Sequence, residues 1–363
     1  MTETQITLRR VAQLAGVSTA TVARVMRRDP HVAPETRERV ETVLGITGYQ
    51  VNAAARGLRR RRMGTIGHLV HGQTSNIFLA AVALGLHEAA GEHALDVVTA
   101  NSQGSADRER DGVEALIRRR VEAFIFTDPV HPDNVRLAMG SGIPVVQVDR
   151  PTAVPSSTVT ADNLGGTRRA AEYLISLGLR RIAFMGRLWE AGSRDDPVEP
   201  ERLRGYEEAM RDAGLPTQVQ IGRRPTGPLA MQVLGRGYMR QILDEGPRPE
   251  AVLATSDLLA AGVLQALYER GLRVPDDIAV VGFGDTYASA LAPALTTVAL
   301  PMLDLGREAL RCALDAGGRL HVRLPTQLIV RDSTPSSPRR PPRRRQTPSR
   351  RWRRTRTRWR SRA

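Results

Sequence analysis

A glycine joins two short helical patterns near the start of the chain. The first pattern is an apolar stripe at helical spacing, formed by Leu8, Val11, Ala12 and Ala15. Gly16 follows, and glycine adopts the positive φ of a sharp turn without a Cβ clash. Ser18 is a favourable N-cap for a second helix, whose apolar face continues through Val22 and Val25. The first residues of the chain are therefore predicted to form a helix-turn-helix.

The residues off the apolar face of the second helix suit a DNA major groove. Thr19 and Ala20 are small, so the start of the helix can approach base edges closely. Arg24 carries a guanidinium fork that matches guanine or a phosphate. The alternative is an ordinary helical hairpin in which these side chains are only solvated, and the hairpin alone does not separate the two interpretations.

The next segments resemble a known family. Residues 34–44 predict a third helix that begins at Pro34, "GYQVNAAARGL" follows over residues 48–58, and "TIG" opens the next segment at Thr65. Together with "LAGVSTATV" these pieces resemble, in order and spacing, the amino terminus of the LacI/GalR family of bacterial repressors. The resemblance implies that Thr19, Ala20 and Arg24 read bases, and that Ser18 and Thr21 contact phosphates.

The same resemblance implies a hinge helix after the helix-turn-helix. Residues 51–63 are the expected hinge and linker, with DNA contacts at Asn52, Ala55 and Leu58. Leu58 matches the leucine that the family inserts into the minor groove, a contact that bends the duplex. Without the preceding domain, a plain connector would be the better interpretation of this segment.

Charge is concentrated at the two ends of the chain. Residues 1–62 contain 12 arginines and 5 acidic residues, and residues 333–363 contain 13 arginines and no acidic residue. Basic segments attract nucleic acids through counterion release. Residues 335–363 are arginine- and proline-rich and are predicted to be a disordered tail. Added nonspecific affinity for nucleic acid and a spurious extension of the reading frame both remain open for this tail.

The body of the chain alternates short apolar runs with amphipathic patterns. Strands are predicted at 65–70, 95–98, 123–127, 144–148, 181–185, 251–254 and 277–281. Helices are predicted at 80–90, 108–119, 165–177, 202–213, 258–270 and 303–316. This order predicts an α/β fold of parallel sheets with helices on both faces. Ligands of such sheets bind beyond the carboxyl ends of the strands.

Residues 64–334 also resemble the LacI/GalR effector-binding domain, which is of the periplasmic-binding-protein type. The motifs include "VDRP" at Val148, "ERLRGYEEAM" at Glu201 and "VPDDIAVVGFGD" at Val274. The resemblance implies two parallel α/β lobes joined by three crossovers. We expect one lobe at about 64–161 and 286–327, and the other at about 162–285 and 328–334. Residues 1–50 then form the helix-turn-helix domain.

The resemblance also implies where a small molecule binds. The expected effector contacts are Asp149, Arg202, Ser256, Asp257 and Gly284. Arg202 matches the family's ligand-clamping arginine, whereas Gly284 stands where the family more often has aspartate. Loss of that acid favours an anionic effector such as a sugar acid or sugar phosphate over a neutral sugar. The alternatives are that Arg202 forms a surface ion pair and that Asp149 and Asp257 cap helices.

These observations predict a repressor that binds a pseudo-palindromic DNA operator as a homodimer and responds to a sugar-like effector. We find no catalytic constellation, no metal-ligand spacing among the seven histidines and no cofactor motif. The single cysteine, Cys312, lies in a helical pattern and is expected to be buried. No signal peptide or membrane span is evident, so we expect a cytoplasmic, nucleoid-associated protein. A transport-type binding protein and an enzyme are the alternatives.

Overall fold

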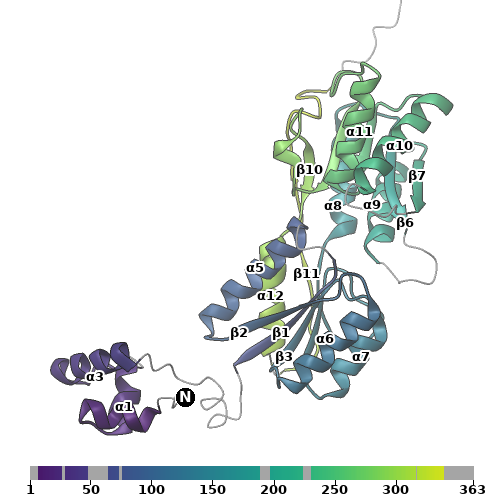
Figure 1. Cartoon of the computed structure of the whole chain (residues 1–363). Helices are drawn as coiled ribbons and strands as arrows, with labels where there is room; N and C mark the ends of the chain where they lie inside the picture. Colours follow the sequence, from purple (N-terminus) through teal and green to yellow (C-terminus); the bar gives the residue numbers. More distant parts are fainter. Residues whose placement is uncertain are drawn as a thin grey trace, which may run out of the picture. The chain divides into compact units, whose positions relative to one another are not determined.

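The amino-terminal domain is a bundle of three helices. The computed structural model describes residues 7–26, 29–47, 64–72, 76–188, 197–223, 230–315 and 317–338. Helices α1 (Leu8–Ala15), α2 (Thr19–Met26) and α3 (Pro34–Thr47) form this domain (Figure 1). They share a small apolar core. Gly16 ends α1 with a φ of 63°, which is the left-handed conformation predicted for the turn. The helix-turn-helix prediction is confirmed.

The first lobe comprises residues 64–161 and 301–324. Its sheet has the order β11-β5-β4-β3-β1-β2, and all neighbouring strands are parallel. The strands are β1 (Thr65–Val70), β2 (Asp96–Asn101), β3 (Ala123–Thr127), β4 (Val145–Val148), β5 (Ser157–Ala161) and β11 (His321–Leu324). One face packs on α5 (Ile77–Glu92) and α12 (Met302–Leu314), and the other on α6 (Ala106–Arg118) and α7 (Pro132–Gly140).

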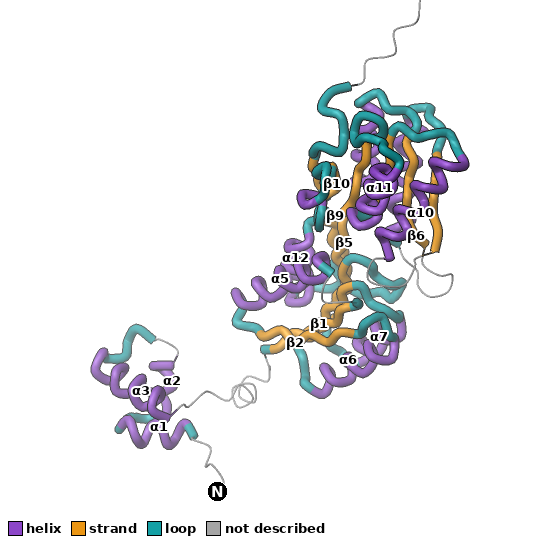
Figure 2. The backbone as a smooth tube through the Cα atoms, turned by 45° about the horizontal axis from the view of Figure 1, so that its top comes forward, coloured by secondary structure: helices purple, strands orange, loops and turns teal. Residues whose placement is uncertain are grey.

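The second lobe comprises residues 162–188, 198–300 and 325–338. Its sheet has the order β12-β10-β9-β8-β6-β7, in which only β12 is antiparallel to its neighbour. Figure 2 shows β6, β9 and β10 of this sheet in orange. The strands are β6 (Ile182–Leu188), β7 (Gln218–Arg223), β8 (Ala251–Ala254), β9 (Ala279–Gly284), β10 (Thr296–Ala299) and β12 (Gln327–Ile329). Helices α8 (Asn163–Ser176) and α9 (Val198–Asp212) cover one face, and α10 (Ala230–Glu245) and α11 (Asp257–Glu269) cover the other.

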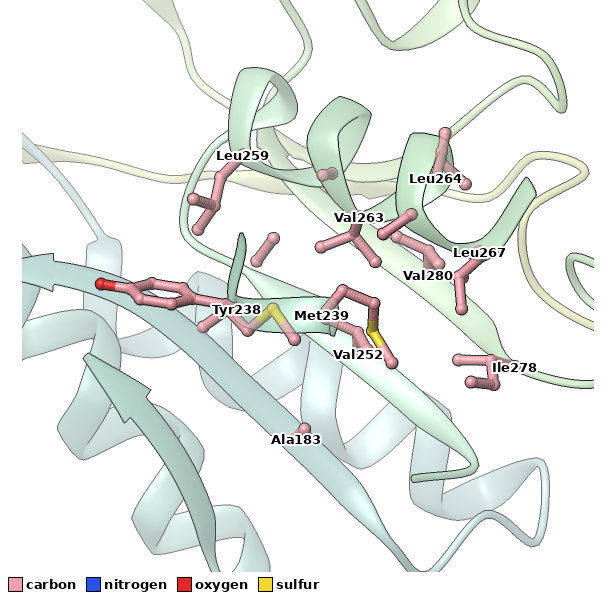
Figure 3. Packing of buried hydrophobic residues seen from close by; sticks show 14 of the residues in the cluster. Ala183, Tyr238, Met239, Val252, Leu259, Val263, Leu264, Leu267, Ile278 and Val280 are labelled. Carbon is pink, nitrogen blue, oxygen red and sulfur yellow. The ribbon is translucent and has the colours of Figure 1, made fainter. Parts of the chain in front are cut away.

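Burial of the central strands on both faces explains why their sequences are continuously apolar. In β9, Val280 packs towards α11, and its neighbour Val281 packs towards α8 and α9. Figure 3 shows the first of these cores, in which Met239 and Val263 from the helices meet Val252 and Val280 from the sheet. A strand covered by helices on both sides has no polar face, so alternation disappears from its sequence.

The boundaries predicted for the lobes in the last part of the chain are wrong. Strand β10 pairs with β9, so residues 286–300 stay in the second lobe and the chain enters the first lobe at Pro301. Strand β12 pairs with β10, so the chain returns to the second lobe at Pro325. The reason is local: the chain turns back through η1 (Ala288–Ala290) and forms β10, a strand of only 4 residues. The predicted hinge at 51–63 lies outside the described residues, as does the tail from residue 339.

Candidate functional site

The second helix of the amino-terminal domain presents the predicted DNA-reading residues. The Ser18 hydroxyl accepts a hydrogen bond from the Thr21 backbone N–H at 3.0 Å, and it contacts the Thr21 hydroxyl at 2.9 Å. Ser18 therefore caps α2 as predicted. Thr19 and Ala20 follow the cap and are exposed, whereas Val22 and Val25 are buried against α1 and α3. The exposed start of α2 is the part of the domain that could approach DNA bases.

Arg24 is exposed but already oriented by a carboxylate. Its Nε donates to Asp29 Oδ2 at 2.8 Å, and Asp29 also accepts from the His31 backbone N–H at 2.9 Å. The bond from Arg24, followed by that from His31, holds the pKa of Asp29 well below its ordinary value. Asp29 is thus ionised at neutral pH. Asp29 was not among the residues predicted from the sequence, although it lies just beyond the end of α2.

A second polar cluster surrounds Arg202 at the carboxyl end of the sheet in the second lobe. Arg202 is only 5% exposed. Its Nε donates to Asn163 Oδ1 at 2.9 Å, its Nη1 donates to the Thr255 carbonyl at 2.6 Å, and its Cζ lies 3.8 Å from the centre of the Phe283 ring. These contacts rule out the alternative of a surface ion pair. They fix the guanidinium plane in a buried position.

Glu199 lies one helical turn before Arg202 on α9. It is 6% exposed, and its Oε1 pairs with Arg187 Nε at 3.3 Å. Its second oxygen, Oε2, is buried and meets no hydrogen-bond donor from the described residues, and the same holds for the Thr255 hydroxyl. Neither Glu199 nor Thr255 was among the residues predicted from the sequence.

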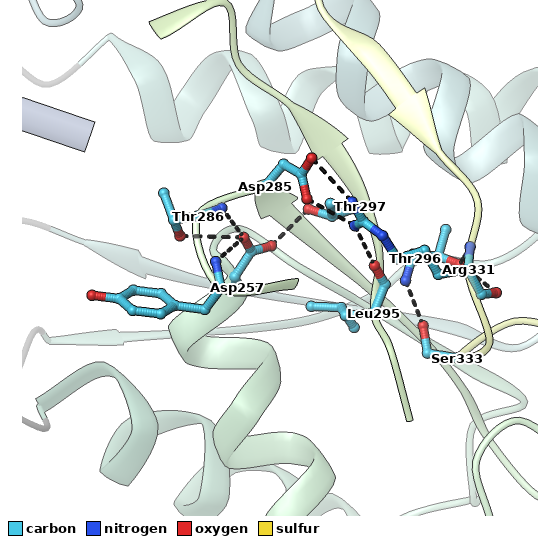
Figure 4. Close-up of polar contacts among 9 residues, drawn as sticks. Asp257, Asp285, Thr286, Leu295, Thr296, Thr297, Arg331 and Ser333 are labelled. Atoms are coloured by element: carbon cyan, nitrogen blue, oxygen red, sulfur yellow. Dashed lines mark hydrogen bonds and ion pairs between the residues drawn. The ribbon is translucent and has the colours of Figure 1, made fainter. Parts of the chain in front are cut away.

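Asp257 accepts hydrogen bonds from the loop after β9. It is fully buried, and its Oδ2 accepts from the Thr286 N–H at 2.7 Å and from the Thr286 hydroxyl at 3.2 Å (Figure 4). Its Oδ1 accepts from the Thr297 hydroxyl at 2.6 Å. Ser256 caps α11 by accepting from the Leu259 N–H at 3.2 Å. Both residues therefore have structural partners, and their predicted contact with an effector remains a prediction.

The loop after β9 also explains the glycine at position 284. Gly284 has a φ of 124°, which L side chains rarely adopt. Asp285, next to it, pairs with Arg331 at 2.7 Å and so points away from Asp257 (Figure 4). Gly284 can thus offer a ligand only its backbone.

Asp149 belongs to the first lobe. It directly follows β4, has a φ of 68° and is 7% exposed. Its Oδ2 lies 3.5 Å from Nε of the neighbouring Arg150, which is also buried. The position beyond the carboxyl end of a strand fits a ligand contact, but the predicted role of Asp149 is untested. Asn52, Ala55 and Leu58 lie outside the described residues.

Comparisons with known proteins define the family. Residues 7–52 match the bacterial regulatory proteins of the lacI family, and residues 171–334 match a periplasmic binding protein-like domain. The chain is 36% identical over 345 residues to the HTH-type transcriptional regulator CelR of Thermobifida fusca, covering 90% of this chain and 98% of CelR.

Solved structures give the same result. The complex of the transcriptional regulator CelR with cellobiose matches with a TM-score of 0.66 and 32% identity, covering 90% of this chain and 99% of that one. The Lac repressor dimer bound to operator and the anti-inducer ONPF matches with a TM-score of 0.76 and 27% identity, covering 91% and 99%.

A helix-turn-helix domain joined to a periplasmic-binding-protein-like domain defines a class of DNA-binding transcriptional regulators that sense small molecules. The chain belongs to the LacI family of these regulators. Family members are regulators of transcription and not enzymes. None of the helices in the described part of the chain has the length and apolar character needed to cross a bilayer. Across the same residues, no group of three or more His, Cys, Asp or Glu side chains is placed to hold a metal ion.

Proposed function

We propose that this chain is a transcriptional repressor that binds a pseudo-palindromic operator as a homodimer. Binding of a sugar-class effector either lowers or raises its affinity for the operator. The observation that carries the proposal is that one chain holds both an exposed helix start at Thr19 and Ala20 and a buried polar cluster around Arg202. The first suits a polyanionic duplex, and the second suits a small hydroxylated ligand.

The effector class is supported by the chemistry around Arg202. Arg202 donates to the carbonyl of Thr255, which directly follows β8, and Glu199 lies one helical turn before Arg202 on α9. Guanidinium and carboxylate groups of this kind recognise the hydroxyls of a saccharide. The related regulator CelR forms a complex with cellobiose, and a solved LacI-family regulator from Enterococcus faecium holds ribose. Carried to this chain, these complexes support a saccharide effector.

The homodimer is supported by a relative and by symmetry. The Lac repressor is a dimer when bound to operator. A two-fold symmetric pair of reading helices requires an operator with two inverted half-sites.

Footprinting tests the proposal. The purified full chain is added to the DNA that flanks its own gene, and nuclease protection is mapped with and without a panel of saccharides. The proposal expects one protected region with two-fold related half-sites, whose occupancy changes with one saccharide. Two results would contradict the proposal. One is protection that no saccharide alters, and the other is the absence of protection at protein concentrations that leave unrelated DNA unprotected.

A further inference from the structure

Three arginines of the first lobe have no partner for their side chains. Several other exposed arginines of this lobe form ion pairs with carboxylates of the same or a neighbouring helix. Within the described residues, the guanidinium groups of Arg119, Arg120 and Arg319 form neither an ion pair nor a hydrogen bond, although all three residues are exposed. A guanidinium group offers five N–H donors, so these three can bind an anion from outside the chain.

The three arginines lie at one edge of the sheet. Arg119 and Arg120 follow α6 and come shortly before β3, and Arg319 comes shortly before β11. All strands of this sheet are parallel, so their amino ends meet at the same edge. Strands β3 and β11 are three positions apart in the sheet, which separates them by about 14 Å at the usual strand spacing. We call this the amino edge of the first lobe.

The amino edge is also where the chain arrives from the DNA-binding domain. The Gly64 N–H donates to Glu122 Oε1 at 2.6 Å, and the Glu122 N–H donates to the Thr65 carbonyl at 2.8 Å. These bonds fix the first residues of the lobe beside the loop that ends at Arg120. In the sequence, residues 59–62 are four consecutive arginines that end just before this anchor. A polyanion attracted by the linker is therefore brought to the amino edge.

Acidic residues near the amino edge have other contacts or other places. Glu114 Oε2 lies 3.9 Å from Nη1 of Arg118, and Glu122 is engaged with the anchor described above. Asp315 accepts a hydrogen bond from the Gly317 N–H at the end of α12. Strand β2, which begins at Asp96, lies on the far side of β1 from β3. The three arginines thus keep their charge available at the surface.

We propose that Arg119, Arg120 and Arg319 contact phosphates of the operator duplex, so that the first lobe itself adds to the affinity for DNA. A duplex carries one negative charge per about 1.7 Å of its axis, so an edge of about 14 Å can face several phosphates. Phosphate contacts position a protein on DNA without reading its sequence. The inference rests on the proposed function, because it takes operator DNA as the ligand.

The salt dependence of DNA binding tests the inference. Anisotropy titrations of the full chain on a labelled operator duplex, at about 50 to 200 mM KCl, give the slope of log K against log salt concentration. In the double variant Arg119→Gln/Arg120→Gln the slope is expected to become less steep by about 1 to 2, because each lost phosphate contact removes about 0.9. In Arg319→Gln it is expected to become less steep by about 1.

The double variant Arg180→Gln/Arg211→Gln is the matched control. It removes the same charge from two exposed arginines of the second lobe, whose guanidinium groups also have no partner among the described residues. Its slope is expected to equal that of the wild type. The ratio of affinities for the operator and for single-base variants is expected to be the same in all these proteins, because phosphates carry no sequence information. Thermal midpoints report whether each variant folds.

Two results would overturn the inference. One is an unchanged slope in both Arg119→Gln/Arg120→Gln and Arg319→Gln. The other is an equal change in the Arg119/Arg120 and Arg180/Arg211 double variants, which would show that net charge alone acts. The same titrations on an unrelated duplex separate the inference from the proposed function. A wild type without preference for operator would contradict the proposed function, whereas the slopes on unrelated DNA would still report contact between the amino edge and phosphates.

Discussion

At the scale of single residues, Arg24 and Asp29 form the most specific feature of the DNA-binding domain. The ion pair at 2.8 Å uses Nε of Arg24, whose side chain is still 47% exposed. Arginine reads guanine through two parallel hydrogen bonds. An arginine that is already held by an ion pair loses less side-chain entropy when it forms them. We therefore propose that Asp29 positions Arg24 for contact with a base.

Arg24→Ala is expected to weaken operator binding by about 1–3 kcal/mol and to relax the preference at one base pair in each half-site, because a bidentate base contact is lost. Fluorescence anisotropy with the footprinted operator and single-base variants measures both effects. Arg39→Ala, which removes an exposed arginine from α3, is the matched control and should leave base preference intact. An operator affinity that falls equally for both variants would contradict a reading role for Arg24.

His68 is a second residue with a measurable consequence. It lies fully buried in β1, and its Nε2 is 2.9 Å from the Thr127 hydroxyl. Burial, with a smaller contribution from His87, lowers the pKa of His68 from 6.5 to about 3. Between these two values the unfolded chain binds a proton that the folded chain does not, so stability falls as pH falls through this window.

His68→Gln removes this titrating group and should therefore reduce the loss of stability on acidification. Thermal unfolding at about pH 7 and about pH 5 gives the comparison, with the window set by the unfolded pKa. The expected result is a smaller drop in Tm for His68→Gln than for the wild type. His93→Gln, at an exposed histidine after α5, serves as control and should behave like the wild type. Equal drops in all three proteins would show that His68 is not the group responsible.

At the scale of elements, close contact between helix pairs is a recurring feature. A Cβ on Gly85 of α5 would overlap the backbone carbonyl of Leu303 at α12, and one on Gly306 of α12 would overlap the backbone of Val82. The α10–α11 pair shows the same relation at Gly235 and Gly262. Glycine at such crossings lets two backbones meet, because no side chain stands between them.

Gly85→Ala should destabilise the first lobe by about 1–3 kcal/mol, since the added methyl group has no space and the helices must separate. Gly91→Ala on the same helix has no atom within 4 Å of the new Cβ and is the matched control. It should be neutral or stabilise by up to about 1 kcal/mol, because alanine favours the helix more than glycine does. Denaturant unfolding measures both. Equal effects of the two substitutions would contradict the packing argument.

Prediction of elements from the sequence succeeded where burial leaves a continuous apolar run. The predicted bounds of β1, β3 and β8 coincide with the structure. Strands β5 and β11 were missed, since β5 is a run of Ser, Thr, Val and Ala and β11 is a partly exposed edge strand. Their pairing is set by partners distant in sequence, which local patterns do not report.

The candidate site was predicted only in part, because local sequence does not report which side chains become buried. Arg202 could be found through the family motif, but Glu199 in the first turn of α9 has the same sequence signature as an acid favoured by the helix dipole. Only the packing around Gly186 and Thr255 shows that its carboxylate is buried. The sequence signal for Glu199 as a site residue was that it precedes Arg202 by three residues.

At the scale of the whole molecule, charge is divided according to role. The DNA-binding end carries 12 arginines against 5 acids in residues 1–62, whereas residues 63–332 carry 28 arginines against 33 acids. A basic reading domain on an acidic body directs a polyanion to one end of the chain. The proposed effector cluster around Arg202 lies in this acidic body, so control of DNA binding by an effector would require energetic coupling between two distinct sites.

A thermodynamic cycle measures that coupling. Operator affinity is measured with and without the saccharide that binds, and saccharide affinity is measured with and without operator. Operator affinity is expected to change by about 5- to 150-fold, and saccharide affinity is expected to change by the same factor, as linkage requires. A saccharide that binds tightly yet leaves operator affinity unchanged would show that the effector site does not control DNA binding.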